Sequence, residues 1–377
     1  VPLKMIDTVA NLFEKYQLMF KSLDENSKQD KEHYDWLLDV LSSEIEVVLG
    51  PPCIDESLAS YAYQSLKQRI TWSTKAVKKA DQDMQLYVAV HRAVLKSNRA
   101  TLRYRILTLY YPKWRSAKAD SQVTKEIVMN LKKVINSVDA QIYHPSSDSV
   151  FRFVRRHAIV FRLISDIARD NPEALAAAIQ SKDQTAIDSA LIAAAKDRYS
   201  TFRTRLTRTV LRATFFLLFT KSVLAILVEY PYELFVLRTT DYLPLAVNIL
   251  FPPLLLALIG LTVRIPKKKN NAKILEEAHS LFDMKEDFAL IYKEKRPWSR
   301  GLLKFIFNVL YLFVFLFVVT LVISALRSIH FNSLSIAFFI FFLSLVAYFG
   351  IRIRNTRREL ILVDAKRPLF WVIGDLL

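Results

Sequence analysis

The sequence contains few glycines and few histidines. Only five of its 377 residues are glycine, and they form no phosphate-binding loop, no dinucleotide-binding fingerprint and no Gly-x-Ser-x-Gly nucleophile turn. The six histidines have no partners at the spacing of metal ligands. We therefore predict no cofactor and no metal site, and nothing in the sequence supports ATP hydrolysis or acyl transfer.

Cysteine is almost absent, since Cys53 is the only one. A single thiol cannot form an internal disulfide or a thiolate metal site. We expect Cys53 to be buried and inert. The carboxylates of the N-terminal segment lie among polar residues rather than in an apolar pocket, so we predict no catalytic residue and expect that the chain is not an enzyme.

Acidic residues are outnumbered by basic ones. The chain has 53 Lys and Arg against 36 Asp and Glu, which gives a formal net charge of +17, and 52% of its residues are hydrophobic. This composition excludes collagenous, disordered and disulfide-stapled proteins. Residues 1–13 show no cleavable targeting signal. Because the sequence starts at Val1 and ends on an apolar run, we expect it to be part of a longer protein.

Four apolar runs are each close to the ~20 residues that an α-helix needs to cross a bilayer. They cover residues 211–228, 243–263, 302–326 and 334–351. The sequence therefore predicts an all-α, polytopic membrane protein, in which a helical cytoplasmic domain is followed by four transmembrane helices.

The charges that flank these runs predict their orientation. Lys and Arg are retained on the cytoplasmic side of a membrane. They cluster before the first run, between the second and the third, and after the fourth, whereas the loops 229–242 and 327–333 hold one Arg each. We predict that these two loops face outward, that both termini are cytoplasmic, and that the protein is integral to a membrane, most simply the cytoplasmic membrane.

The chain before the membrane is predicted to be a helical bundle. Residues 1–200 have one glycine and apolar positions that repeat every three or four residues, which favours roughly six or seven helices and no strand. The expected breaks lie at Pro51 and Pro52, at Pro112, at Pro145, and at Asn171 with Pro172. The predicted domains are a cytoplasmic bundle at 1–200, which is one domain or two small ones, a four-span region at 201–353 with a cytoplasmic loop at 264–301, and a truncated cytoplasmic segment at 354–377.

A long helix is predicted to join the bundle to the first span. Residues 183–230 contain neither glycine nor proline, and their first part is rich in alanine. One continuous helix over this range would be on the order of 70 Å long. We interpret it as a stiff stalk, with a break near Ser200 as the alternative.

Basic residues on the predicted cytoplasmic face have two interpretations. They could bind anionic lipid, or they could form an ordinary solvated helix face, and nucleic acid is a less favoured partner because no nucleic-acid-binding fold is recognisable. We predict one helix over residues 81–111 that carries Arg92, Lys96, Arg99 and Arg103 along one face. The candidate lipid contacts are Arg92, Lys96, Arg99, Arg103, Arg205, Arg208, Arg212, Lys267, Lys268 and Lys269.

The loop between the second and third spans contains an amphipathic pattern. Ile274, Ala278, Leu281 and Phe282 recur at helical spacing after the three lysines. Such a helix could lie in the membrane interface or dock onto the N-terminal bundle, and the sequence does not separate these two options.

Two polar residues lie inside the predicted spans. Lys221 is near the middle of the first, where a lysine costs roughly 2.5 to 3.5 kcal/mol, so it should face protein or water. In the second span Pro252 and Pro253 cannot donate a backbone hydrogen bond, which frees carbonyls near Asn248. We predict a polar site at Lys221, Asn248, Pro252 and Pro253 in which the ammonium bonds Asn248 and the freed carbonyls.

This site has a structural and a transport interpretation. It could be a staple between spans, or the constriction of a conduction path whose outer mouth carries Glu229, Glu233 and Asp241. The staple is favoured, because transporters usually carry several intramembrane carboxylates or paired broken helices.

The sequence thus favours a membrane-anchored scaffold or adaptor whose cytoplasmic domain binds protein partners or anionic lipid. A channel or transporter subunit with a path around Lys221 and Asn248 is the first alternative, and an enzyme of lipid or envelope metabolism is the second. The bilayer is the one expected partner of known chemistry, and assembly of identical copies is an open option.

Overall fold

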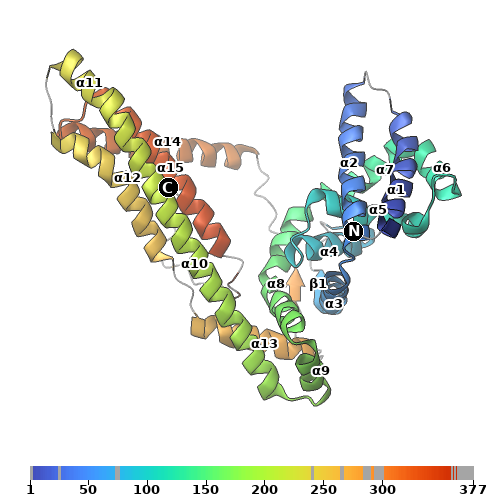
Figure 1. Cartoon of the computed structure of the whole chain (residues 1–377). Helices are drawn as coiled ribbons and strands as arrows, with labels where there is room; N and C mark the ends of the chain where they lie inside the picture. The colour runs from blue at the N-terminus through green and yellow to red at the C-terminus, as the bar shows by residue number, and fades with distance from the viewer. Residues whose placement is uncertain are drawn as a thin grey trace. The chain divides into compact units, whose positions relative to one another are not determined.

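A computed structural model of the chain describes residues 3–23, 27–72, 77–238, 242–263, 267–282, 290–292 and 301–357, together with Leu360 and Leu362. It is almost entirely helical, which confirms the all-α class (Figure 1). The chain divides into two compact units. Unit 1 comprises residues 1–187 and 276–294, and unit 2 comprises 188–275 and 295–377.

Unit 1 is built from short helices, most of which begin or end where the sequence predicts a break. Asn171, for example, caps the helix that starts at Pro172 by accepting a bond from the N–H of Ala174 at 3.0 Å. The helices are α1 (Leu3–Lys21), α2 (Lys28–Leu49), α3 (Cys53–Arg69), α4 (Lys79–Ala93), α5 (Arg99–Tyr110), the 3₁₀ turn η1 (Pro112–Ser116), α6 (Gln122–Met129), α7 (Leu131–Ile142), α8 (Ser147–Asp170) and α9 (Pro172–Gln180).

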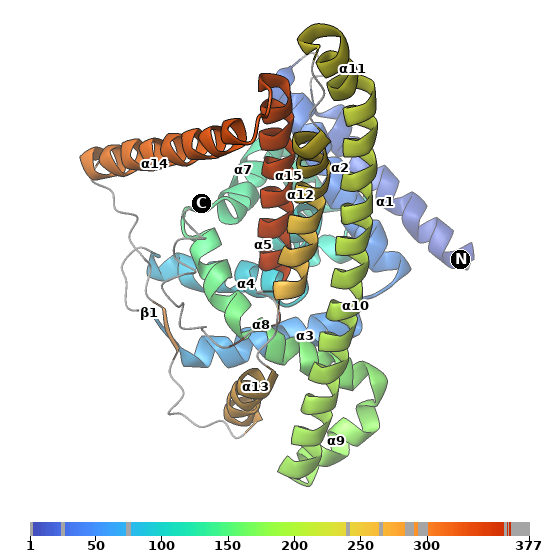
Figure 2. The same ribbon diagram turned by 90° about the vertical axis from the view of Figure 1, so that its left-hand side faces the viewer.

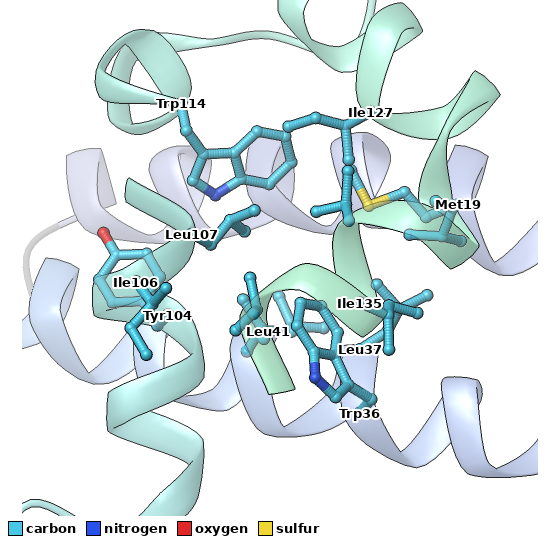
Figure 3. Packing of buried hydrophobic residues seen from close by; sticks show 14 of the residues in the cluster. Met19, Trp36, Leu37, Leu41, Tyr104, Ile106, Leu107, Trp114, Ile127 and Ile135 are labelled. Atoms are coloured by element: carbon cyan, nitrogen blue, oxygen red, sulfur yellow. The ribbon is translucent and has the colours of Figure 1, made fainter. Parts of the chain in front are cut away.

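The core of unit 1 lies where α1, α2, α5, α6 and α7 meet around η1. Trp36, Leu37, Ile106 and Trp114 are among its fully buried side chains (Figure 3). Aromatic and aliphatic side chains from helices far apart in sequence interdigitate there, and each such residue contributes about 1.5–3 kcal/mol when fully buried. This core explains why helices too short to be stable alone persist in unit 1.

An ion pair is enclosed in the same core. The ammonium of Lys15 donates to Glu44 at 2.7 Å and lies 3.8 Å from the centre of the Trp114 ring. Glu44 also accepts from the hydroxyl of Tyr16 at 2.6 Å and from the indole N–H of Trp114 at 3.0 Å. Burial lowers the pKa of Lys15, and the Glu44 carboxylate partly offsets this effect.

The structure differs from the sequence expectation at two places in unit 1. A two-stranded parallel sheet pairs β1 (Ile70–Trp72) with β2 (Leu290–Tyr292), whereas we predicted no strand. The predicted helix over 81–111 is also wrong, because it breaks between α4 and α5. Lys96 has a left-handed backbone there, and the side chain of Asn98 caps α5 through the N–H of Thr101.

Unit 2 contains the four helices that are long and apolar enough to cross a membrane. Its first helical stretch runs without interruption over Gln184–Leu237, which confirms the continuous helix predicted over 183–230. It consists of α10 (Gln184–Leu224), a π-helical turn η2 (Ala225–Glu229), α11 (Tyr230–Tyr232) and a second π turn η3 (Glu233–Leu237). The other helices are α12 (Tyr242–Thr262), α14 (Gly301–Ser328) and α15 (Ser333–Arg357); α13 (Lys267–Phe282) contributes to both units.

Three of these helices, α10, α12 and α15, run side by side (Figures 1 and 2). Leu217, Leu256, Phe342 and Val346 fill the space between them. α14 diverges from this bundle and packs against it by its last turns, through Val322, Ile323 and Leu326 (Figure 2). It is the least buried of the candidate spans, with 6% of its apolar window buried against 28% for α15.

One end of unit 2 is tied together by Asn270, which is fully buried. Its amide donates to the hydroxyl of Tyr199 on α10 at 2.7 Å and to the carbonyl of Leu360 at 2.8 Å. Its side-chain oxygen accepts from the N–H of Leu362 at 2.7 Å. The start of α13 and the chain after α15 are therefore both attached to α10.

Candidate intramembrane polar site

Glu229 is the centre of a buried polar cluster in unit 2. Its Oε1 accepts from the Lys221 ammonium at 2.6 Å, and its Oε2 accepts from the amide of Asn248 and from the hydroxyl of Ser335 at 3.2 Å. Lys221, Glu229 and Asn248 have no exposed surface. One carboxylate thus joins the first stretch of helix to α12 and α15. These three helices lie side by side in Figure 1.

The local backbone explains how Glu229 reaches Lys221. Eight residues of α-helix would place it roughly 80° around the axis from Lys221. Pro231 has no N–H to donate, and the chain next to it forms π turns instead, in which Tyr230 bonds back to Ala225 and Arg238 back to Glu233. A π turn rotates through a smaller angle per residue about the helix axis. The angular offset between the two residues therefore shrinks, and Glu229 comes to the face that carries Lys221.

The Lys221 ammonium is surrounded by favourable groups besides the carboxylate. It lies 5.2 Å from the centre of the Phe338 ring and 5.0 Å from that of Phe342, both on α15. Cations are attracted to aromatic faces, more strongly where water is excluded. The sequence predicted a direct bond from Lys221 to Asn248, and the structure instead places Glu229 between them as a shared acceptor.

Asn248 contributes a donor to the cluster and leaves an acceptor unused. Its amide also approaches the carbonyl of Ser335 at 3.4 Å, while its side-chain oxygen Oδ1 is buried without a hydrogen-bond partner. Pro252 and Pro253 lie one turn further along α12, are buried, and do not interrupt the helix. The four residues predicted as a polar site therefore lie in one region, but of these four described residues only Lys221 and Asn248 donate a side-chain hydrogen bond to Glu229.

A second buried carboxylate follows Glu229. Glu233 is 5% exposed and accepts from the amide of Asn332 at 2.7 Å. The side-chain oxygen of Asn332 accepts in turn from the N–H of Ser335, which caps α15. A hydrogen-bonded chain therefore extends from Lys221 through Glu229, Ser335 and Asn332 to Glu233.

Two of the three residues assigned to an outer mouth lie in helical turns rather than in an open loop. Glu229 and Glu233 belong to the π turns and are buried inside the helix bundle. Asp241 lies outside the described residues. Glu229 and Glu233 thus belong to the same hydrogen-bonded chain as Lys221 rather than to an entrance in front of it.

Several basic residues assigned to lipid are used within unit 1. Arg103 is held by Asp39 and Asp139, each at 2.7 Å, so it serves the fold. Arg92 bonds Asp148 at 2.8 Å, and Arg99 lies over the Tyr143 ring. Lys96 lies in the turn between α4 and α5. These four residues do not form one stripe, because they belong to two helices and a turn.

The remaining basic candidates are exposed in unit 2. Arg205, Arg208 and Arg212 on α10, and Lys267, Lys268 and Lys269 at the start of α13, make no ion pair within the described part of the chain. The bond between Tyr199 and Asn270 brings the start of α13 to the same end of α10. The six cations lie in the two segments that this bond joins, the three arginines after Tyr199 and the three lysines before Asn270, and we call them the basic collar.

Sequence reasoning missed several residues and misjudged one. Ser335 and Asn332 gave no signal, because a serine in an apolar run and an asparagine in a loop are ordinary. Cys53 is exposed at the start of α3, so the expectation of a buried thiol is wrong. Among the described residues, no group of three or more His, Cys, Asp or Glu side chains could hold a metal ion.

Chemically, the cluster joins one ammonium and one carboxylate at hydrogen-bonding distance and covers them with apolar side chains. Leu217, Leu256, Phe342 and Val346 pack between the helices beside it. Such an arrangement holds helices together. Comparison with known proteins adds nothing to this description, since no family model, curated protein or solved structure matches the chain.

Proposed function

We propose that the protein is a membrane-anchored scaffold or adaptor, whose helical unit 1 binds partners and whose basic collar binds anionic lipid. The observation that carries this proposal is the ion pair of Lys221 and Glu229. Both members of this pair lie on the first helical stretch, and the Glu229 carboxylate also accepts hydrogen bonds from α12 and α15. It therefore specifies which helices pack together, as an anchor requires.

The basic collar supports the lipid part of the proposal. The stretch of α10 from Tyr199 to Thr220 carries no acidic residue, so Arg205, Arg208 and Arg212 have no local counter-charge. The exposed Phe215, Phe216 and Phe219 follow directly, as at the boundary between head groups and hydrocarbon. Each basic residue near an anionic surface contributes about 1 kcal/mol of attraction.

Native mass spectrometry of the full chain tests the lipid contact. The protein is released from nanodiscs that contain an anionic phospholipid, and the retained lipids are counted. We expect Arg205→Gln, Arg208→Gln and Arg212→Gln together to remove most of them. The control is Lys31→Gln, Lys125→Gln and Lys133→Gln, three exposed lysines of unit 1 whose loss changes the net charge equally. Equal retention by both triple variants would contradict the collar.

A channel or transporter subunit is the second candidate function. It is favoured by one observation, the buried and unpartnered Oδ1 of Asn248 beside the charged pair. Transport sites need polar protein groups inside the membrane that are available to coordinate the solute. Flux of ions or solutes into sealed vesicles distinguishes the two functions. The scaffold predicts no flux for the wild-type chain, whereas flux that Lys221→Met abolishes would replace the scaffold by transport.

A further inference from the structure

One side of α8 carries arginine side chains on a helix whose position in unit 1 is fixed. Val150 and Val154 are fully buried, and they hold this helix against its neighbours. From Ser149 to Ser165 the helix carries four arginines and no acidic residue. Arginines that project from a well-packed helix keep a defined spacing, as a binding surface requires.

Another side of α8 is covered by the chain between α12 and α14. Phe153 lies edge-to-face against Tyr292 of β2, with ring centres 5.5 Å apart. The ring nitrogen Nδ1 of His157 lies 2.7 Å from Glu277 of α13. The structure therefore agrees with docking of the amphipathic helix onto the bundle, which is one of the two options that the sequence left open.

Arg92, Arg152 and Arg155 form what we call the arginine surface. The guanidinium carbon Cζ of Arg92, on α4, lies 4.4 Å from the centre of the Phe151 ring, and that of Arg155 lies 5.4 Å from the same centre. Arg152, the next residue after Phe151, is exposed. A guanidinium held over an aromatic ring keeps its N–H groups available to bind an anion.

The hydrogen-bonding capacity of the arginine surface is only partly used. Arg92 donates to the hydroxyl of Ser147 at 3.0 Å and to the carboxylate of Asp148 at 2.8 Å. Within the described part of the chain, Arg152 and Arg155 donate no hydrogen bond and form no ion pair. The surface thus already holds one carboxylate, and two guanidinium groups remain for carboxylates from outside the unit.

The composition of this surface favours an acidic protein segment over a bilayer. Peripheral binding to a bilayer is strongest where aromatic side chains can insert beside the basic residues. Phe151 is instead half-buried and lies under two guanidinium groups, and Asp148, whose side chain is 73% exposed, would face the anionic head groups. All three cations are arginines, whose planar fork matches a carboxylate.

We infer that the arginine surface binds an acidic segment of a partner protein. Arg152 and Arg155 each receive a carboxylate, and a further carboxylate of the partner competes with Asp148 for Arg92. This inference rests on the proposed scaffold function and names the chemistry of the partner that unit 1 binds.

Fluorescence anisotropy of a labelled peptide tests the inference. The probe is a run of glutamates between glycines, the blank is the same peptide with glutamines, and the full chain is kept in a neutral detergent. We expect Arg152→Gln with Arg155→Gln to raise the dissociation constant at least about tenfold, because two charge-assisted contacts are lost. The control is Lys125→Gln with Lys133→Gln, at two exposed lysines of unit 1, which removes the same charge and should change the constant less than about twofold.

Two single variants separate geometry from charge. Arg155→Lys keeps the positive charge but loses the planar fork, so we expect it to bind the glutamate peptide more weakly than the wild type does. Asp148→Asn removes the competing carboxylate and should strengthen binding about twofold to fivefold. Unfolding temperatures like that of the wild type show that each variant keeps its fold.

The inference is overturned if the glutamate peptide binds the double arginine variant as tightly as the wild type, or no better than the glutamine peptide binds. Equal losses in the arginine and lysine variants would overturn it as well. If the double arginine variant instead loses anionic lipid in native mass spectrometry, a bilayer occupies this surface and the inference fails. The lipid part of the proposed function fails by a different result, which is equal lipid retention by the collar variant and its control.

Discussion

At the scale of residues, two buried carboxylates are each paired with a lysine. Glu44 and Glu229 each accept a hydrogen bond from a lysine ammonium and from two further donors. Removing one member of such a pair leaves an uncompensated charge and typically costs 3–5 kcal/mol, whereas replacing both by apolar or neutral groups is far milder. The pairs therefore specify which helices meet more than they add to stability.

This asymmetry predicts the behaviour of variants at the intramembrane pair. We expect Lys221→Met and Glu229→Gln each to lower the unfolding temperature of the purified protein in detergent, and the double variant to recover most of the loss. Thermal unfolding followed by far-ultraviolet circular dichroism measures it, because the described tryptophans, Trp36, Trp72 and Trp114, all lie in unit 1. Single variants that unfold like the wild type would show that the two side chains are not paired.

His91 predicts a loss of stability in acid. Burial and the nearby Arg105 guanidinium lower its pKa to about 3, against 6.5 for an unperturbed histidine. The unfolded chain therefore binds a proton below pH 6.5 that the folded chain does not, and stability falls by up to about 1.4 kcal/mol per pH unit down to pH 3. Between pH 7 and pH 4.5, the unfolding temperature should fall less steeply for His91→Gln than for the wild type. The control is His330→Gln, at an exposed site, which should match the wild type.

The sequence identified part of the polar site and missed the rest for a physical reason. Lys221 and Asn248 stand out because polar groups in an apolar run are costly. Glu229 follows the run directly and was therefore assigned to a loop, since apolar content does not show that a helix continues past it. Ser335 is chemically neutral and fits both lipid and protein surroundings.

At the scale of elements, α12 packs closely against α10 through Gly260. A Cβ built at Gly260 would meet both Cγ atoms of Val210 at 2.7 Å, so only glycine permits the observed approach. At Gly350 on α15, by contrast, the nearest atoms belong to Ile259 and lie 3.6 Å away, which is ordinary contact. Small residues at close crossings are typical of helices that pack within membranes.

We expect Gly260→Ala to lower the unfolding temperature, because either the helices separate or Val210 leaves its rotamer. Adding Val210→Ala removes both clashing atoms and should restore part of the loss. Gly350→Ala serves as the matched control and should change little. A Gly260→Ala variant as stable as the wild type would show that α10 and α12 lie further apart.

The continuity of α10 predicts slow hydrogen exchange at its centre. Residues 199–209 lie in the interior of a helical stretch of 54 residues, where the backbone N–H groups are bonded. Mass spectrometry of exchange in the full chain should find this range as protected as residues 186–196. Fast exchange near Ser200 would instead favour the broken helix that the sequence left as an alternative.

Helices were predictable where particular residue types mark their ends or their length, and not elsewhere. Proline and asparagine mark the ends of α2, α5 and α9, and long apolar runs mark the spans. The break at Lys96 contains neither glycine nor proline, so the helical spacing of the basic residues predicted one helix across it. The strands have three residues each, which is too short for a recognisable alternation of apolar and polar residues. They form because β2 pairs with β1, which is distant in the sequence.

At the scale of the whole molecule, four helices are long and apolar enough to cross a membrane. The placement of both termini on the cytoplasmic side remains a prediction from the flanking charges. The only native thiol offers a direct test, because Cys53 is exposed in unit 1.

A membrane-impermeant maleimide should label Cys53 in inside-out vesicles and spare it in intact cells. In a Cys53→Ser background, a cysteine at the exposed His330, in the turn between α14 and α15, should show the opposite pattern. Labelling of both positions from the same side would contradict the predicted arrangement of the spans.

The contact between Phe153 and Tyr292 also has a consequence for synthesis on the ribosome. Phe153 emerges long before Tyr292, which covers it in the finished protein. At 5–20 residues per second, translation of the intervening chain lasts on the order of ten seconds. During this interval two candidate spans must be inserted while the aromatic surface of the nascent domain stays uncovered. We therefore expect nascent unit 1 to bind chaperones until Tyr292 has been translated.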